Sequence, residues 1–160
     1  MARKYERSLS RQEALQLLYQ SEIRSTAATE LIGSGTVLLA QELPADDQDE
    51  PLINELLLDD YARYLVDGVC SHREELDARI AAVSENWSIN RMPILDLNVL
   101  RIALFELLFA QDIPASVAIN EAVELAKEYG TDESSKFVNG ILGCIAREVE
   151  AQQGTQEAGE

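Results

Sequence analysis

The segment that most restricts the fold is residues 117–142, VAINEAVELAKEYGTDESSKFVNGIL, which carries two apolar stripes separated by a helix breaker. The first stripe has helical spacing and comprises Ala118, Ala122, Leu125, Ala126 and Tyr129. Gly130 follows, a residue suited to the left-handed turn that ends a helix, and Thr131 or Asp132 can cap the next helix. The second stripe comprises Phe137, Val138, Ile141, Leu142 and Ile145. The segment therefore predicts a packed helical hairpin.

Helical spacing of apolar residues recurs in the rest of the chain. Ser10 and Glu13 have the spacing of a capping box, which predicts a helix start near Ser10. Residues 56–83 have an apolar period typical of one or two helices, and residues 97–109 are apolar on most sides, as in a central helix of a bundle. Because no segment combines strand alternation with turn residues, the sequence predicts an all-α protein built as a compact helical bundle.

The length of 160 residues is typical of one domain, which we place at residues 1–150. An acidic loop with prolines at both ends, PADDQDEP, occupies residues 44–51. Pro93 separates the first helical regions from the later ones. Residues 151–160 are polar with two glycines, and we expect them to form a flexible tail.

Charge is distributed unevenly along this chain of net charge −16. Residues 1–24 hold five basic and three acidic side chains, whereas the remainder holds 8 basic and 26 acidic ones. The N-terminus is therefore a net-positive segment in an acidic chain, and phosphate binding requires cations of this kind. The alternative interpretation is a solvated segment that aids solubility.

Motifs for catalysis and metal binding are absent from the sequence. The single histidine, His72, lies among charged residues and is interpreted as a helix-end or solvated side chain. There is no Cys-x-x-Cys pair, and Cys70 and Cys144 are expected to be buried thiols in a reducing cytoplasm. No signal peptide or membrane span is predicted, and no metal site or cofactor is expected. These absences favour a binding protein over an enzyme.

Three ordered blocks carry a resemblance to a known family. They are RSLSRQEALQLLYQSEI at 7–23, DDYARYLVDGV through LDLNVLRIALFELL at 59–108, and DIPASVAINEAVELAKEYG through FVNGIL at 112–142. Together they resemble the NusB family of bacterial transcription antitermination factors. The resemblance implies two helical subdomains, about 1–90 and 91–150, without catalysis. It also implies binding of boxA single-stranded RNA from ribosomal leader transcripts with NusE, a ribosomal protein, and assembly on RNA polymerase.

The resemblance also implies RNA-contacting positions. The matching residues are Arg7, Arg11, Gln16 and Tyr19 in the first block and, less directly, Lys136 and Phe137 in the third. Arg7 and Arg11 are four residues apart on a helix and can present guanidinium groups side by side to phosphate. Tyr19 can stack on a splayed base, or it can be an aromatic residue at the edge of the core.

Alternatives remain open at this stage. Ser8 and Leu9 stand where other family members often continue the arginine run, which allows a protein-only scaffold that binds NusE without recognising RNA. NusB-like domains also occur in ribosomal RNA methyltransferases, but the sequence has no glycine-rich cofactor loop. Family members can be monomers or homodimers, and the sequence does not decide between these states.

Overall fold

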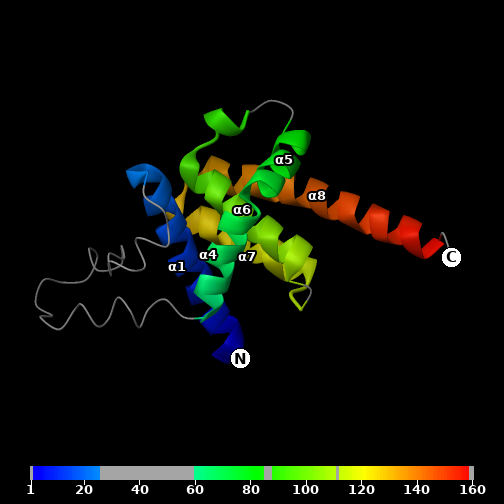
Figure 1. Ribbon diagram of the computed structural model, residues 1–160, viewed down its shortest axis with the longest axis horizontal. Coiled ribbons are helices and arrows are strands. Elements are labelled where there is room, and N and C mark those ends of the chain that lie inside the picture. The colour runs from blue at the N-terminus through cyan, green and yellow to red at the C-terminus, as the bar shows by residue number, and fades with distance from the viewer. Residues whose placement is uncertain (1, 26–59, 85–87, 111, 159–160) are drawn as a thin grey trace, which may run out of the picture. The chain divides into compact units, whose positions relative to one another are not determined.

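The computed structural model contains helices and no strand in the parts of the chain that it describes, residues 2–25, 60–84, 88–110 and 112–158 (Figure 1). This confirms the predicted all-α class. In chain order the elements are α1 (Ala2–Arg24), α4 (Asp60–Ser71), α5 (Arg73–Val83), the short 3-10 helix η2 (Ile89–Arg91), α6 (Ile94–Phe109), α7 (Ala115–Tyr129) and α8 (Asp132–Ala158). The predicted acidic loop at 44–51 lies outside the described residues.

Packing divides the chain into two compact units, Met1–Ser71 and His72–Glu160. In the first unit α1 packs against α4, and in the second unit α6 packs against α5, α7 and α8. The family resemblance implies subdomains of about residues 1–90 and 91–150, whereas the division by packing falls after Ser71. The difference arises because α5 packs against α6 and α8 and therefore belongs to the second unit.

Helix α1 begins at Ala2, so the predicted helix start near Ser10 is wrong. Ser10 lies inside the helix and is fully buried. The residues before it, ARKYERSL at 2–9, contain neither proline nor glycine, so nothing in them interrupts the helix. The buried apolar residues that α1 and α4 contribute are Ala14, Leu15, Leu17, Leu18, Ala62, Leu65, Val66 and Val69. This pair of helices forms the described core of the first unit.

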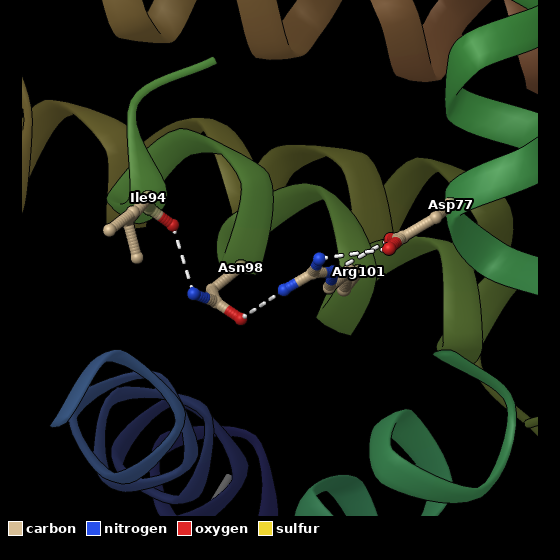
Figure 2. A network of polar contacts seen from close by, with 4 residues as sticks. All are labelled: Asp77, Ile94, Asn98 and Arg101. Atoms are coloured by element: carbon tan, nitrogen blue, oxygen red, sulfur yellow. Dashed lines mark hydrogen bonds and ion pairs between the residues drawn. The ribbon is translucent and has the colours of Figure 1, made fainter. Parts of the chain in front are cut away.

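Helix α6 is buried from residue 96 to residue 106, and two of its polar side chains, Asn98 and Arg101, belong to a hydrogen-bonded network (Figure 2). Arg101, which is 2% exposed, donates its Nε to Oδ1 of Asp77 at 2.7 Å and its Nη2 to Oδ2 at 2.9 Å. Its Nη1 donates to Oδ1 of Asn98 at 3.2 Å, and Nδ2 of Asn98 donates to the carbonyl oxygen of Ile94 at 2.9 Å. The network joins α6 to α5 and accounts for the buried cation of α6, whose hydrogen-bonding groups have partners.

The corner between α7 and α8 confirms Thr131 as a cap and corrects the role of Gly130. The N–H of Ser134 donates to Oγ1 of Thr131 at 3.3 Å, and the N–H of Thr131 donates to Oγ of Ser134 at 3.1 Å. Gly130 is extended, with φ −107° and ψ −152°, so the predicted left-handed turn is wrong. A Cβ at this position would lie 2.7 Å from Oγ of Ser134 and 2.9 Å from the carbonyl oxygen of Ala126. Glycine is therefore required here for space.

Two further expectations differ from the structure. Cys70 is exposed and Cys144 is partly exposed, so the prediction of two buried thiols is wrong. Helix α8 extends to Ala158 and so includes most of the segment assigned to a polar tail, where Gln, Glu and Ala favour helix. Among the described residues, no helix has the length and apolar character needed to cross a membrane. No group of three or more His, Cys, Asp or Glu side chains in those residues could hold a metal ion.

Candidate nucleic-acid interface

Two arginines of α1, Arg7 and Arg11, lie near one aromatic ring of α4. The Cζ atom of Arg7 lies 4.7 Å from the centroid of the Tyr61 ring, and that of Arg11 lies 5.8 Å from it. Both distances are within the range of cation–π attraction. Arg7 is partly exposed, but Arg11 is only 2% exposed. Of the two arginines, Arg7 therefore offers more surface to a ligand, while Arg11 brings a second positive charge to the same ring.

A second tyrosine extends this cluster toward solvent. The ring of Tyr64 lies 5.8 Å from that of Tyr61, with 38° between the ring planes, and Tyr64 is 43% exposed. Sequence reasoning missed both tyrosines as candidate site residues. Their spacing of three residues on a helix is a signal that could have paired them with each other. Their partnership with the arginines depends on how α1 packs against α4, which the sequence spacing does not contain.

The other two candidates on α1 do not lie over the Tyr61 ring. Gln16 follows Arg7 by about two and a half helical turns and so projects from the opposite side of α1. It is partly buried. Tyr19 is 38% exposed and lies one turn before Ile23, which is 55% exposed. The structure thus brings Arg7 and Arg11 together, separates Gln16 from them, and leaves Tyr19 on an exposed, partly apolar edge.

The two candidates from the third sequence block lie at the start of α8, in the second unit. Lys136 is exposed. Phe137 is partly buried and lines a cavity of about 450 Å³. The other residues lining the cavity are Pro93, Leu95, Asp96, Tyr129, Gly130, Thr131, Glu133 and Ser134. Small-molecule sites in proteins are usually lined by aromatic and aliphatic side chains with a few polar groups.

Asp96 contributes a carboxyl group to this cavity. Burial raises the pKa of Asp96 above its ordinary value of 3.8, and a hydrogen bond with the Ser134 side chain opposes part of that increase. The raised pKa means that the folded protein binds a proton at Asp96 more tightly than the unfolded chain does. The charged carboxylate is therefore a local source of instability at neutral pH, which a polar ligand or a neutral substitution could relieve.

Replacing Asp96 with asparagine tests this effect. A folded-state pKa above the unfolded value contributes stability at low pH that is lost as the pH rises through the folded-state pKa. Asp96→Asn is therefore expected to raise the free energy of unfolding at about pH 7, and the gain should disappear below the ordinary pKa of aspartate. Urea denaturation of both proteins at the two pH values measures the difference. If the substitution changed the free energy of unfolding equally at both pH values, the raised pKa of Asp96 would be contradicted.

Comparison with known proteins agrees with the architecture. A sequence model of the NusB family matches residues 8–147. The transcription antitermination protein NusB of Myxococcus xanthus is 44% identical over 140 residues, which cover 88% of this chain and 94% of that protein. The structure of T. maritima NusB has a TM-score of 0.67 at 37% identity and covers 89% of this chain and 91% of that one. A chain in the crystal structure of antitermination factors NusB and NusE in complex with dsRNA has a TM-score of 0.68 at 28% identity, and the match covers 90% of this chain and 98% of that one. The chain therefore belongs to the NusB family.

Proposed function

We propose that this protein is a transcription antitermination factor. It binds boxA RNA of ribosomal leader transcripts together with NusE, and it assembles with RNA polymerase in the cytoplasm. Support comes from its relatives, which carry the name of transcription antitermination proteins, and from the similar structure, which contains NusB, NusE and dsRNA. The six candidate RNA-contacting residues form part of the proposal.

The observation that carries the proposal is the placement of Arg7 over the ring of Tyr61. A guanidinium group pairs with phosphate through two parallel hydrogen bonds, and an aromatic surface beside it limits the conformations that the side chain can adopt. Arg7 lies within residues 1–24, the segment in which basic side chains outnumber acidic ones by five to three. An acidic chain that binds RNA gains most from cations concentrated in one place, because the remaining carboxylates repel phosphate.

The acidic remainder of the chain suits a basic protein partner. Residues 25–160 hold 26 acidic and 8 basic side chains. Charge complementarity of this kind accelerates association and disfavours partners of the same sign. We propose that NusE, which as a ribosomal protein is expected to be basic, is this partner and supplies further positive charge to the bound RNA.

Catalysis forms no part of the proposal. His72 precedes α5, stacks on Phe109 with 4.1 Å between ring centroids, and places its Nδ1 3.6 Å from Glu75. Oε1 of Glu124 lies 3.7 Å from Nζ of Lys127 on the exposed surface of α7. These contacts suit structural and solvated roles for both side chains.

Fluorescence anisotropy of a labelled boxA-type single-stranded RNA tests the proposal. The RNA is titrated with this protein alone and with an equimolar mixture of this protein and NusE, at two salt concentrations, with a scrambled RNA of equal length as the control. We expect the mixture to bind boxA more tightly than the protein alone, and to bind more weakly as salt increases. If NusE binds the protein but neither boxA nor scrambled RNA binds the mixture, a protein-only scaffold replaces the proposal.

A further inference from the structure

The aromatic cluster of the first unit reaches beyond the arginine pair. Tyr61 lies under both guanidinium groups, and the ring of Tyr64 continues the cluster along α4 with 43% of its surface exposed. Arg63, between the two tyrosines in sequence, is also exposed. Cations and aromatic rings therefore alternate over a short stretch of α4 and the facing part of α1.

We propose that Tyr64 stacks on a base of bound single-stranded RNA while Tyr61 positions Arg7 for the adjoining phosphate. The inference rests on the proposed RNA binding and extends it to two residues of α4. Single-stranded RNA is held by this combination, in which cations follow the backbone and aromatic side chains stack on unpaired bases. Tyr64 is the contacting residue, and Tyr61 acts through Arg7.

The difference in burial between the two tyrosines assigns their separate roles. Tyr61 is partly buried and lies within 5.8 Å of both guanidinium carbons, so its ring is already occupied by the protein's own cations. A contact that only joined α1 to α4 would require Tyr61 alone. Tyr64 keeps 43% of its surface exposed, where a flat nucleobase can reach its ring.

Base stacking by Tyr64 and phosphate binding by Arg7 predict different salt dependence. The slope of log affinity against log salt counts phosphate contacts, at about 0.7 per phosphate on a single strand. Base stacking does not contribute to this slope. Loss of Tyr64 should therefore weaken binding without changing the slope, whereas misplacement of Arg7 should reduce the slope.

The experiment is the boxA titration with NusE, repeated over a series of salt concentrations. Tyr64→Ala is expected to bind about tenfold more weakly with the slope of the unaltered protein, and Tyr64→Phe to bind normally because it keeps the ring. Tyr61→Leu is expected to lower the slope by about 0.7. In an Arg7→Ala background, Tyr61→Leu should add nothing further, since its effect passes through Arg7.

The charge-matched control is Arg147→Ala, which removes an exposed cation from α8 in the second unit. It should leave both affinity and slope close to those of the unaltered protein.

Urea denaturation establishes that each variant folds, and the Tyr64 variants test the stacking role even if Tyr61→Leu is unstable. If the unaltered protein binds boxA and Tyr64→Ala binds within twofold of it, this inference is overturned while the proposed function stands. If the unaltered protein does not bind RNA with NusE, both are overturned.

Discussion

Replacing Asp77 with alanine is expected to lower the free energy of unfolding by about 3 kcal/mol. The substitution removes the carboxylate that accepts two hydrogen bonds from Arg101, whose side chain is 2% exposed. Removing one partner of a buried ion pair is costly because the other charge stays in a poorly solvated place. The figure is at the lower end of the usual range, since Asp77 keeps 24% of its surface exposed and Asn98 still accepts a bond from Arg101. Urea denaturation followed by far-ultraviolet circular dichroism measures the change.

Two further variants separate the effect of an orphaned charge from other causes. Arg147→Ala removes an exposed arginine and should change stability by less than about 0.5 kcal/mol. Arg101→Met combined with Asp77→Ala removes both charges and should be more stable than Asp77→Ala alone. The single variant Arg101→Met completes the comparison. If the double variant loses as much stability as Asp77→Ala and Arg101→Met lose together, the two residues do not act as a unit.

Gly130→Ala is expected to destabilise the protein by about 1–3 kcal/mol, the usual range for overpacking. The added methyl group would lie 2.7 Å from Oγ and 2.8 Å from Cβ of Ser134, and 2.9 Å from the backbone carbonyl of Ala126. Ser134 cannot yield easily because its hydroxyl and N–H form the reciprocal cap with Thr131. Thermal unfolding of the variant should therefore occur at a lower temperature.

Gly140→Ala provides the matched control on the same hairpin. A Cβ at Gly140 meets nothing within 4 Å, and the residue is exposed within α8. Alanine there should stabilise the helix by about 0.5–1 kcal/mol, because it restricts the unfolded chain more than glycine does. Destabilisation by both substitutions, or by neither, would contradict the steric account of Gly130.

The sequence predicted those parts of the fold that depend on local spacing. Ala118, Ala122, Leu125 and Ala126 form the buried side of α7 because residues three and four apart share one side of a helix. The cap at Thr131 was also predictable from local sequence, because threonine is a favoured capping residue and follows the glycine that separates the two stripes. The central position of α6 was predictable because a helix that is apolar on most sides must be surrounded by others.

Features that arise only when helices pack together were missed. Tyr61 becomes part of the candidate site because α1 lies against α4, and Arg11, which was predicted to face phosphate beside Arg7, is only 2% exposed in the folded chain. Gly130 was assigned to a left-handed turn from residue type, yet its neighbours decide its role. The first turns of α1 were missed because Ser10 and Glu13 fit a local capping pattern that also occurs inside helices.

The location of the Arg101–Asp77 pair has a practical consequence for purification. At about 1 M salt the screening length falls to about 3 Å, which weakens contacts between surface cations and phosphate far more than a pair in the protein interior. Arg101 is 2% exposed, so the bridge between α5 and α6 should persist in such a buffer. A concentrated salt wash should therefore elute co-purifying cellular nucleic acid and recover the folded protein ready for reconstitution.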